Sequence, residues 1–142
     1  MRFARIAFWI AGIYGLLSLP PLYFLFDYIG RQTPPPITHP HFYYGFVGVS
    51  LAFQFVFCII ATDPLRFRPM ILPSIIEKLS YMAAVAALYM QGRIMGSEAA
   101  TALPDTLLCA LFVVAWFKTA NLSPRASAAS SRPPVPMNVR IP

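Results

Sequence analysis

Charged residues are scarce in this chain, and acids are the scarcest. Asp and Glu together number five in 142 residues, and charged residues make up 11% of the chain, whereas about 25% is usual in a soluble domain. With 58% hydrophobic residues, this composition excludes an ordinary soluble domain and indicates an integral membrane protein. The net charge of +6 then bears on orientation in the membrane, and we expect no nucleic-acid partner because no nucleic-acid-binding motif is present.

Motifs of catalysis are also missing. The sequence has no phosphate-binding or dinucleotide-binding glycine loop, no nucleophile elbow and no zinc-protease motif. Cys58 and Cys109 are expected at different depths in the membrane, which excludes a disulfide within one chain. We therefore expect no cofactor and assign no catalytic residue.

Long hydrophobic runs are abundant. Four of them are long enough to cross a hydrocarbon layer, which needs about 20 helical residues. They cover residues 6–26, 43–61, 71–91 and 101–118. The sequence predicts an all-α integral membrane bundle of four transmembrane helices within residues 1–118. The first run continues past the length of a signal peptide without a small-residue cleavage site, so we expect a span there.

Basic residues divide unevenly between the two sides of the predicted membrane. One side carries Arg2, Arg5, Arg66, Arg68, Lys118, Arg125, Arg132 and Arg140. The other carries only Arg31 and Arg93. The positive-inside rule therefore predicts a multi-pass protein of the cell inner membrane with both termini cytoplasmic. Residues 119–142, rich in Ser, Ala and Pro and without an acid, are predicted to form a disordered basic cytoplasmic tail.

Small residues mark the expected helix contacts, because lipid provides no hydrophobic drive between helices. The predicted packing positions are Ala11, Gly15 and Ser18 in the first run and Gly45, Gly48 and Ala52 in the second. Pro20 and Pro21 remove two backbone donors and predict a kink in the first run. On the second run, Ser50 and Gln54 form a polar stripe. It suits either an interhelical hydrogen bond by Gln54 or contact with a ligand.

Glu77 and Lys78 place two charges inside the third run. Neighbours on a helix point about 100° apart, so we do not expect them to pair. Lys78 shares a face with apolar residues, and we expect it to extend along lipid toward the headgroups. Glu77 shares a face with Tyr81 that we expect to point inward.

Glu77 has two interpretations. In the first, favoured by Pro73 and Ser74 as helix-start residues, Ser74 and Glu77 form a capping box near the interface. In the second, the helix begins near Met70 and Glu77 is an intramembrane acid, the kind of group that relays protons or holds a ligand.

The loop before the second run carries a weak metal-binding pattern. His39 and His41 alternate around Pro40, and the acids Asp27, Glu98 and Asp105 are predicted on the same side of the membrane. Imidazole and carboxylate groups could bind zinc, but the pattern favours ordinary interfacial histidines. Asp105 is also explained by the positive end of the fourth helix, and Asp63 by capping a short turn.

Three segments give the chain a layout that resembles small bacterial four-span proteins of the DoxX-like and uncharacterised membrane protein type. They are RFARIAFWIAGIYGLL, HPHFYYGFVGVSLAFQF and IIEKLSYMAAVAALY. The resemblance implies a compact four-helix membrane bundle with both ends inside. It carries no functional residues with it.

Three classes of function follow. The first is a non-catalytic membrane component that lies in the lipid bilayer and assembles with itself or with a membrane protein partner. The second is a binder or transporter of a lipid-like or small hydrophobic ligand. Its candidate ligand contacts are Ser50, Gln54, Glu77 and Tyr81. The third is a lipid-modifying enzyme that uses Glu77 as acid or base.

Overall fold

The computed structural model describes residues 1–32 and 37–120. All regular structure within these residues is helical, as the sequence predicts. Four stretches are long and apolar enough to span a membrane: Arg2–Tyr23, Pro40–Thr62, Arg68–Met90 and Gly96–Ala120. The chain is therefore an all-α, multi-pass membrane protein. The predictions made for the tail beyond residue 120 lie outside the described residues.

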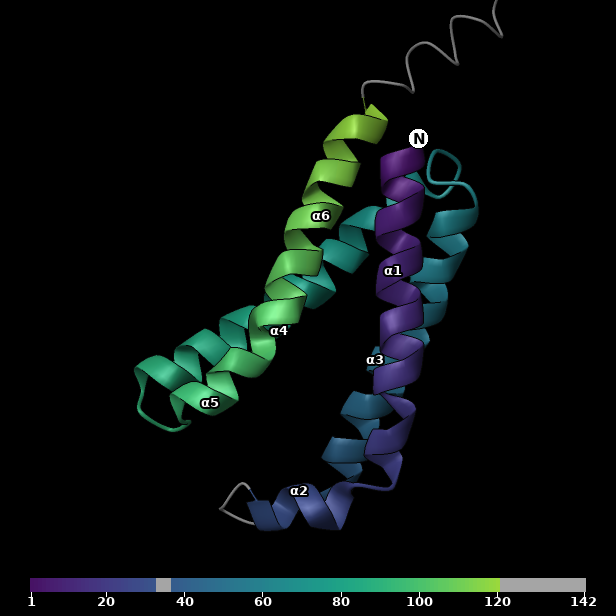
Figure 1. Ribbon diagram of the computed structural model, residues 1–142. Helices are drawn as coiled ribbons and strands as arrows, with labels where there is room; N and C mark the ends of the chain where they lie inside the picture. The colour runs from purple at the N-terminus through teal and green to yellow at the C-terminus, as the bar shows by residue number, and fades with distance from the viewer. Residues whose placement is uncertain (33–36, 121–142) are drawn as a thin grey trace, which may run out of the picture.

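The described residues form nine helical elements, eight of them within the four spans, because three of the spans begin or end in a short helical turn. In chain order, the described residues form α1 (Arg2–Ser18), η1 (Pro20–Tyr23), α2 (Phe26–Gln32), α3 (Pro40–Thr62), η2 (Arg68–Met70), α4 (Ile71–Met90), α5 (Gly96–Ala99), η3 (Ala100–Ala102) and α6 (Leu103–Ala120). The short helix α2 lies in a stretch predicted to be loop. It crosses the end of the α1 and α3 pair (Figure 1).

Local sequence explains where these helices begin and end. The two prolines at 20 and 21 lack backbone N–H groups, and the predicted kink takes the form of a change from α1 to the 3₁₀ turn η1. Pro40 opens α3 at the first helical position, where the missing donor costs nothing. The Asp63 carboxylate accepts hydrogen bonds from the backbone N–H groups of Leu65 and Arg66, both at 3.2 Å, as predicted for a turn cap.

A glycine ends α4. Gly92 has φ of +67°, which a residue with a side chain rarely adopts. Its N–H donates to the carbonyl of Tyr89 at 2.9 Å, and the N–H of Arg93 donates to the carbonyl of Leu88 at 3.0 Å. This Schellman arrangement turns the chain toward α5 and the fourth span.

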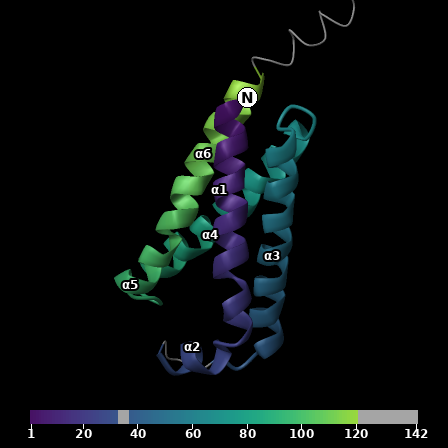
Figure 2. The ribbon, with the colours of Figure 1, turned by 45° about the vertical axis from the view of Figure 1, so that its right-hand side comes forward.

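The helices are arranged as two antiparallel pairs that meet at one end and separate at the other. α1 packs along α3, α4 packs along α6, and α1 also contacts α6. Figures 1 and 2 show both described termini and the turn between α3 and α4 gathered at one end. We call this the closed end. The opposite end, which carries α2 and α5, is the open end, and the space between the pairs there is the wedge.

Stacked aromatic rings fill the core toward the closed end. Phe8 of α1, Phe57 of α3 and Phe112 of α6 are each fully buried. The centroids of Phe8 and Phe112 lie 4.2 Å apart, and those of Phe57 and Phe112 lie 5.0 Å apart. Because these rings come from three spans, they hold the two helix pairs together where the wedge begins.

Some of the predicted packing positions lie at contacts between helices, and others do not. Ala11 and Gly15 of α1 are buried, as expected. A Cβ atom built on Gly15 would overlap the side chain of Gln54, so α1 and α3 approach closely there. Gly48 faces the hydroxyl of Tyr23, 3.2 Å from such a Cβ.

Two positions in the second run do not pack as predicted. Gly45 and Ala52 are exposed, and a Cβ on Gly45 would meet nothing within 4 Å. The helix contact predicted through Gly45 and Ala52 therefore does not form within the described chain. Val47, Gln54 and Phe57 point inward instead, and the Gln54 side chain lies against α1 at Gly15.

Candidate functional site

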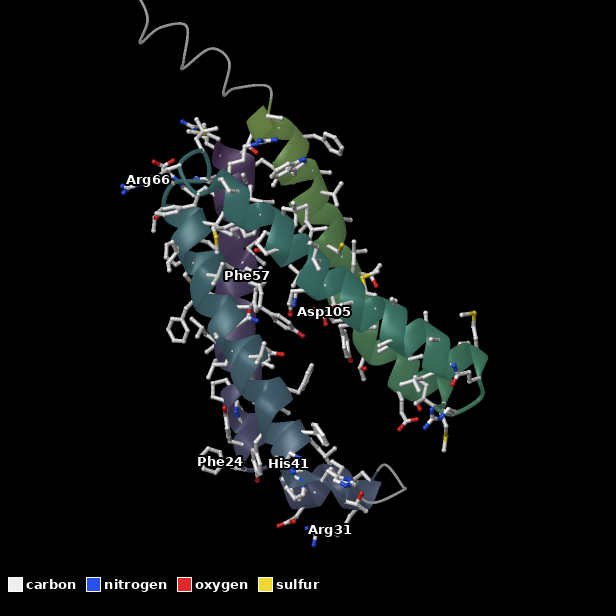
Figure 3. All side chains as sticks on the ribbon, turned by 180° about the vertical axis from the view of Figure 1, so that it is seen from behind. Phe24, Arg31, His41, Phe57, Arg66 and Asp105 are labelled. Carbon is white, nitrogen blue, oxygen red and sulfur yellow. The ribbon has the colours of Figure 1, made fainter. Side chains whose placement is uncertain are left out.

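Three charged side chains meet at the point where the helix pairs separate. The Nζ atom of Lys78 lies 2.6 Å from Oδ1 of Asp105 and 3.2 Å from Oε2 of Glu77. The Lys78 side chain is only 8% exposed, against 17% for Glu77 and 24% for Asp105. Figure 3 shows Asp105 at the angle between the pairs.

The lipid-facing position predicted for Lys78 is wrong. The buried face of α4 carries Ile71, Ser74, Ile75 and Lys78, and this face packs against α6. The ammonium also lies 5.4 Å from the ring centroid of Phe57, close enough for a cation–π contact.

The expectation that Glu77 and Lys78 would not pair is also wrong. Their Cα–Cβ bonds diverge around the helix, but the long Lys78 stem bends its ammonium back toward the neighbouring carboxylate.

The capping-box interpretation of Glu77 is wrong as well. α4 begins at Ile71, so Ser74 lies inside the helix and its hydroxyl donates to the carbonyl of Met70 at 2.8 Å. Glu77 therefore lies within the membrane-spanning segment, as in the alternative interpretation. Its Oε2 atom is buried and has no hydrogen-bond partner in the described part of the chain, although it is within ion-pair distance of Lys78.

Asp105 lies deeper than predicted. The fourth span begins at Gly96, five residues before its predicted start, and runs to Ala120. Asp105 therefore lies nine residues after the start of the span instead of four, and it takes part in an ion pair in addition to its place in the first turn of α6.

A cavity of about 140 Å³ adjoins this charged cluster, and all four spans contribute to its lining. Its polar lining residues are Tyr14, Ser18, Ser50, Gln54, Glu77, Lys78, Tyr81 and Asp105. We call this space the cavity. Gln54 is almost fully buried, and its amide donates to the carbonyl of Ser50 in the same helix at 2.8 Å. The interhelical hydrogen bond predicted for Gln54 is replaced by this bond within α3.

An apolar groove lies beside the cavity, between α3 and α4. Its volume is about 480 Å³, and its lining includes Phe42, Phe46 and Val49 of α3. The groove shares four lining residues with the cavity: Phe46, Ser50, Glu77 and Tyr81. The rings of Phe46 and Tyr81 lie 6.0 Å apart, so these two side chains connect α3 to α4 across the wedge. A polar space and an apolar space thus lie side by side and share part of their walls.

The structure brings together all four predicted ligand contacts. Ser50, Gln54, Glu77 and Tyr81 line the cavity, while their role in binding stays a prediction. Sequence reasoning missed Lys78 and Asp105 as members of the site. Both interrupt apolar runs, and a charge in such a run is itself a signal of function.

The predicted zinc site does not form in the described residues. His39 and His41 are adjacent, with ring centroids 5.9 Å apart, but His39 Nδ1 shares a hydrogen bond with Thr38 Oγ1 at 2.9 Å. No group of three or more His, Cys, Asp or Glu side chains that could hold a metal ion occurs within residues 1–32 and 37–120. His41 instead lines the groove.

No protein-family model matches the chain, and none of the curated proteins and none of the solved structures matches it. The resemblance to DoxX-like proteins is therefore neither supported nor refuted, and it stays an expectation.

Proposed function

We propose that this protein binds an amphipathic, lipid-like molecule within the membrane. The observation that carries the proposal is that the cavity and the groove lie side by side and share Phe46, Ser50, Glu77 and Tyr81 as lining. A polar head of a few atoms suits the cavity, and a hydrocarbon chain suits the groove. Ligand sites in proteins commonly combine apolar walls with a few convergent polar groups in this way.

The cluster of charges also favours a binding site over a purely structural role. Ionisable side chains are costly in the hydrocarbon layer, and those that occur there usually mark substrate or ion pathways. Here three of them line one cavity. The same role was the second of the three classes expected from the sequence, and it now has residues from all four spans to support it.

The proposal includes an orientation in the cell inner membrane with both termini in the cytoplasm. Arg5, Arg66, Arg68 and Lys118 are at the closed end, and the positive-inside rule assigns such an end to the cytoplasm. Several of these residues have specific contacts there. Arg5 donates to the carbonyl of Thr62 at 3.1 Å, and the Arg68 guanidinium lies 3.8 Å from the ring centroid of Trp116. In this orientation the wedge opens into the outer leaflet.

Native mass spectrometry of the protein released from mild detergent tests the proposal. We expect a stoichiometric adduct with the mass of a lipid-like molecule. Gly45→Trp should remove it, because Gly45 lines the groove and has open space beside it. Ala52→Trp is the matched control, since Ala52 is an exposed residue of the same helix that does not line the groove.

Two results would count against the proposal. One is wild-type protein without an adduct under conditions that preserve its fold. The other is an adduct that both tryptophan variants retain equally. The same spectrum gives the number of subunits, which tests the expected assembly with a second copy.

A further inference from the structure

The charges in the cavity are unbalanced. Of the residues that line it, Glu77 and Asp105 carry carboxylates and Lys78 carries the single ammonium. With all three ionised, the cluster has a net charge of −1. An unbalanced charge within the membrane is costly unless a partner of opposite sign is present.

The two carboxylates are not held equally. Asp105 makes the shorter ion pair, with Oδ1 at 2.6 Å from the Lys78 ammonium. Glu77 is held more loosely: its two oxygens lie 3.2 and 3.4 Å from the same nitrogen, and Oε2 has no hydrogen-bond partner among the described residues. Glu77 is thus the carboxylate with spare capacity to accept hydrogen bonds.

Glu77 also occupies the boundary between the two spaces. It lines both the cavity and the groove, whereas Lys78 and Asp105 line only the cavity. Ser50 and Tyr81 line both spaces as well, and the Tyr81 hydroxyl shares a hydrogen bond with Thr101 Oγ1 at 3.3 Å. A head group entering from the groove therefore reaches Glu77 without displacing Lys78 from Asp105.

We propose that the ligand is an amphiphile with a single primary ammonium head, which binds at Glu77 and places its hydrocarbon chain in the groove. This inference rests on the proposed function and specifies the class of ligand. A primary ammonium brings one positive charge, which balances the cluster, and three N–H donors, which suit the Glu77 carboxylate and the neighbouring hydroxyls. An anionic head would instead add to the excess negative charge.

The test compares three probes that share one chain and differ in head group: dodecylamine, dodecan-1-ol and dodecanoate. The full-length protein is equilibrated with each in phosphatidylcholine nanodiscs at neutral pH, and the bound fraction is read by native mass spectrometry. We expect dodecylamine to bind about tenfold more tightly than dodecan-1-ol, since hydrogen bonds to charged groups are stronger than neutral ones. Dodecanoate should bind most weakly.

Two variants test whether Glu77 is the residue that causes the preference for the amine. Glu77→Gln should abolish the advantage of the amine over the alcohol while leaving alcohol binding in place, and that retained binding shows that the variant is folded. Asp27→Asn, which removes a carboxylate of α2 outside the cavity, should keep the preference.

The outcomes separate the inference from the proposed function. Equal binding of amine and alcohol to the wild-type protein overturns the ammonium assignment and leaves amphiphile binding intact. This result would mean that a proton on Glu77 already balances the charge of the cluster. An amine preference that survives in Glu77→Gln overturns the role of Glu77. Failure of all three probes to bind overturns the proposed function itself.

Discussion

Lys78 of α4 and Asp105 of α6 form a 2.6 Å ion pair inside the membrane-spanning region. The pair lies beside the aromatic core of Phe8, Phe57 and Phe112. It therefore joins the last two spans to each other at the place where they leave the first two. Its loss should affect both the stability of the fold and the shape of the cavity.

Replacing Lys78 with methionine should be strongly destabilising. The substitution keeps the volume of the side chain but leaves Glu77 and Asp105 as two carboxylates without a counter-charge. Removing one partner of a buried ion pair typically costs about 3–5 kcal/mol. The free energy of unfolding, measured by SDS titration in mixed micelles, checks this value. Adding Asp105→Asn should recover part of the loss, because one uncompensated charge is then removed.

Lys118→Met is the control for this substitution. Lys118 is exposed at the closed end, where its ammonium lies 4.4 Å from the ring centroid of Phe3. Losing an exposed cation–π contact costs about 0.5–1 kcal/mol. If Lys78→Met and Lys118→Met lower the free energy of unfolding by equal, small amounts, the Lys78 ammonium reaches the headgroups instead of pairing with Asp105.

Gly15→Ala should destabilise the protein by about 1–3 kcal/mol, the usual cost of overpacking. The added methyl group would overlap the Gln54 side chain, which lies over the backbone of α1 at this point. Gly45→Ala is the matched control on α3. Its methyl group meets nothing within 4 Å, so we expect a neutral effect or a gain of no more than about 1 kcal/mol. Similar losses from both substitutions, measured in the same unfolding assay, would argue against the close contact at Gly15.

Phe112→Ala should leave a cavity among the stacked rings of the core. In a soluble protein such a change costs about 3–5 kcal/mol, but part of that cost is transfer to water, which unfolding within a membrane or micelle does not involve. We therefore expect a smaller loss than this range. Phe117→Ala, at a residue of the same helix that is 63% exposed, should have little effect. The prediction is wrong if Phe112→Ala and Phe117→Ala lower the free energy of unfolding by the same amount.

Cysteine labelling in intact cells tests the proposed orientation. In a background of Cys58→Ala and Cys109→Ala, Arg31→Cys at the open end should react with a membrane-impermeant maleimide. Arg66→Cys at the closed end should react only after the cells are permeabilised. The reverse pattern would place the termini outside.

The four spans could be predicted from sequence because they depend on composition and length alone. Runs of apolar residues long enough to cross a bilayer have few alternative structures. The rotation of each helix was harder to predict. Lys78 was placed toward lipid from its apolar neighbours along one face, but its environment is decided by α6, whose position the local pattern does not reveal.

The depth of Asp105 was missed for a related reason. The polar stretch Gly96–Ser97–Glu98 resembles the end of a loop, yet it begins the fourth span through the short helix α5. Glu98 accepts a hydrogen bond from the N–H of Met95 at 2.8 Å and so fixes that helix start. With the start of the span misplaced, Asp105 was assigned to the outer start of the fourth helix. The four polar residues predicted to contact a ligand could be picked out because polar side chains in apolar runs are conspicuous, and all four line the cavity; their contact with a ligand stays a prediction.

The pairing of Lys78 with Asp105 has a consequence for how the chain enters the membrane. A charged residue near the centre of a span costs about 2.5–3.5 kcal/mol during insertion by the translocon, and α4 carries two such residues. Lys78 has Glu77 beside it in α4, but Asp105, the partner in its shorter ion pair, arrives only with α6, which follows after the short turn at Gly92 and the α5 segment. Partition of α4 into lipid is therefore favoured once α6 has been synthesised, and the last two spans should leave the translocon together as one helical hairpin.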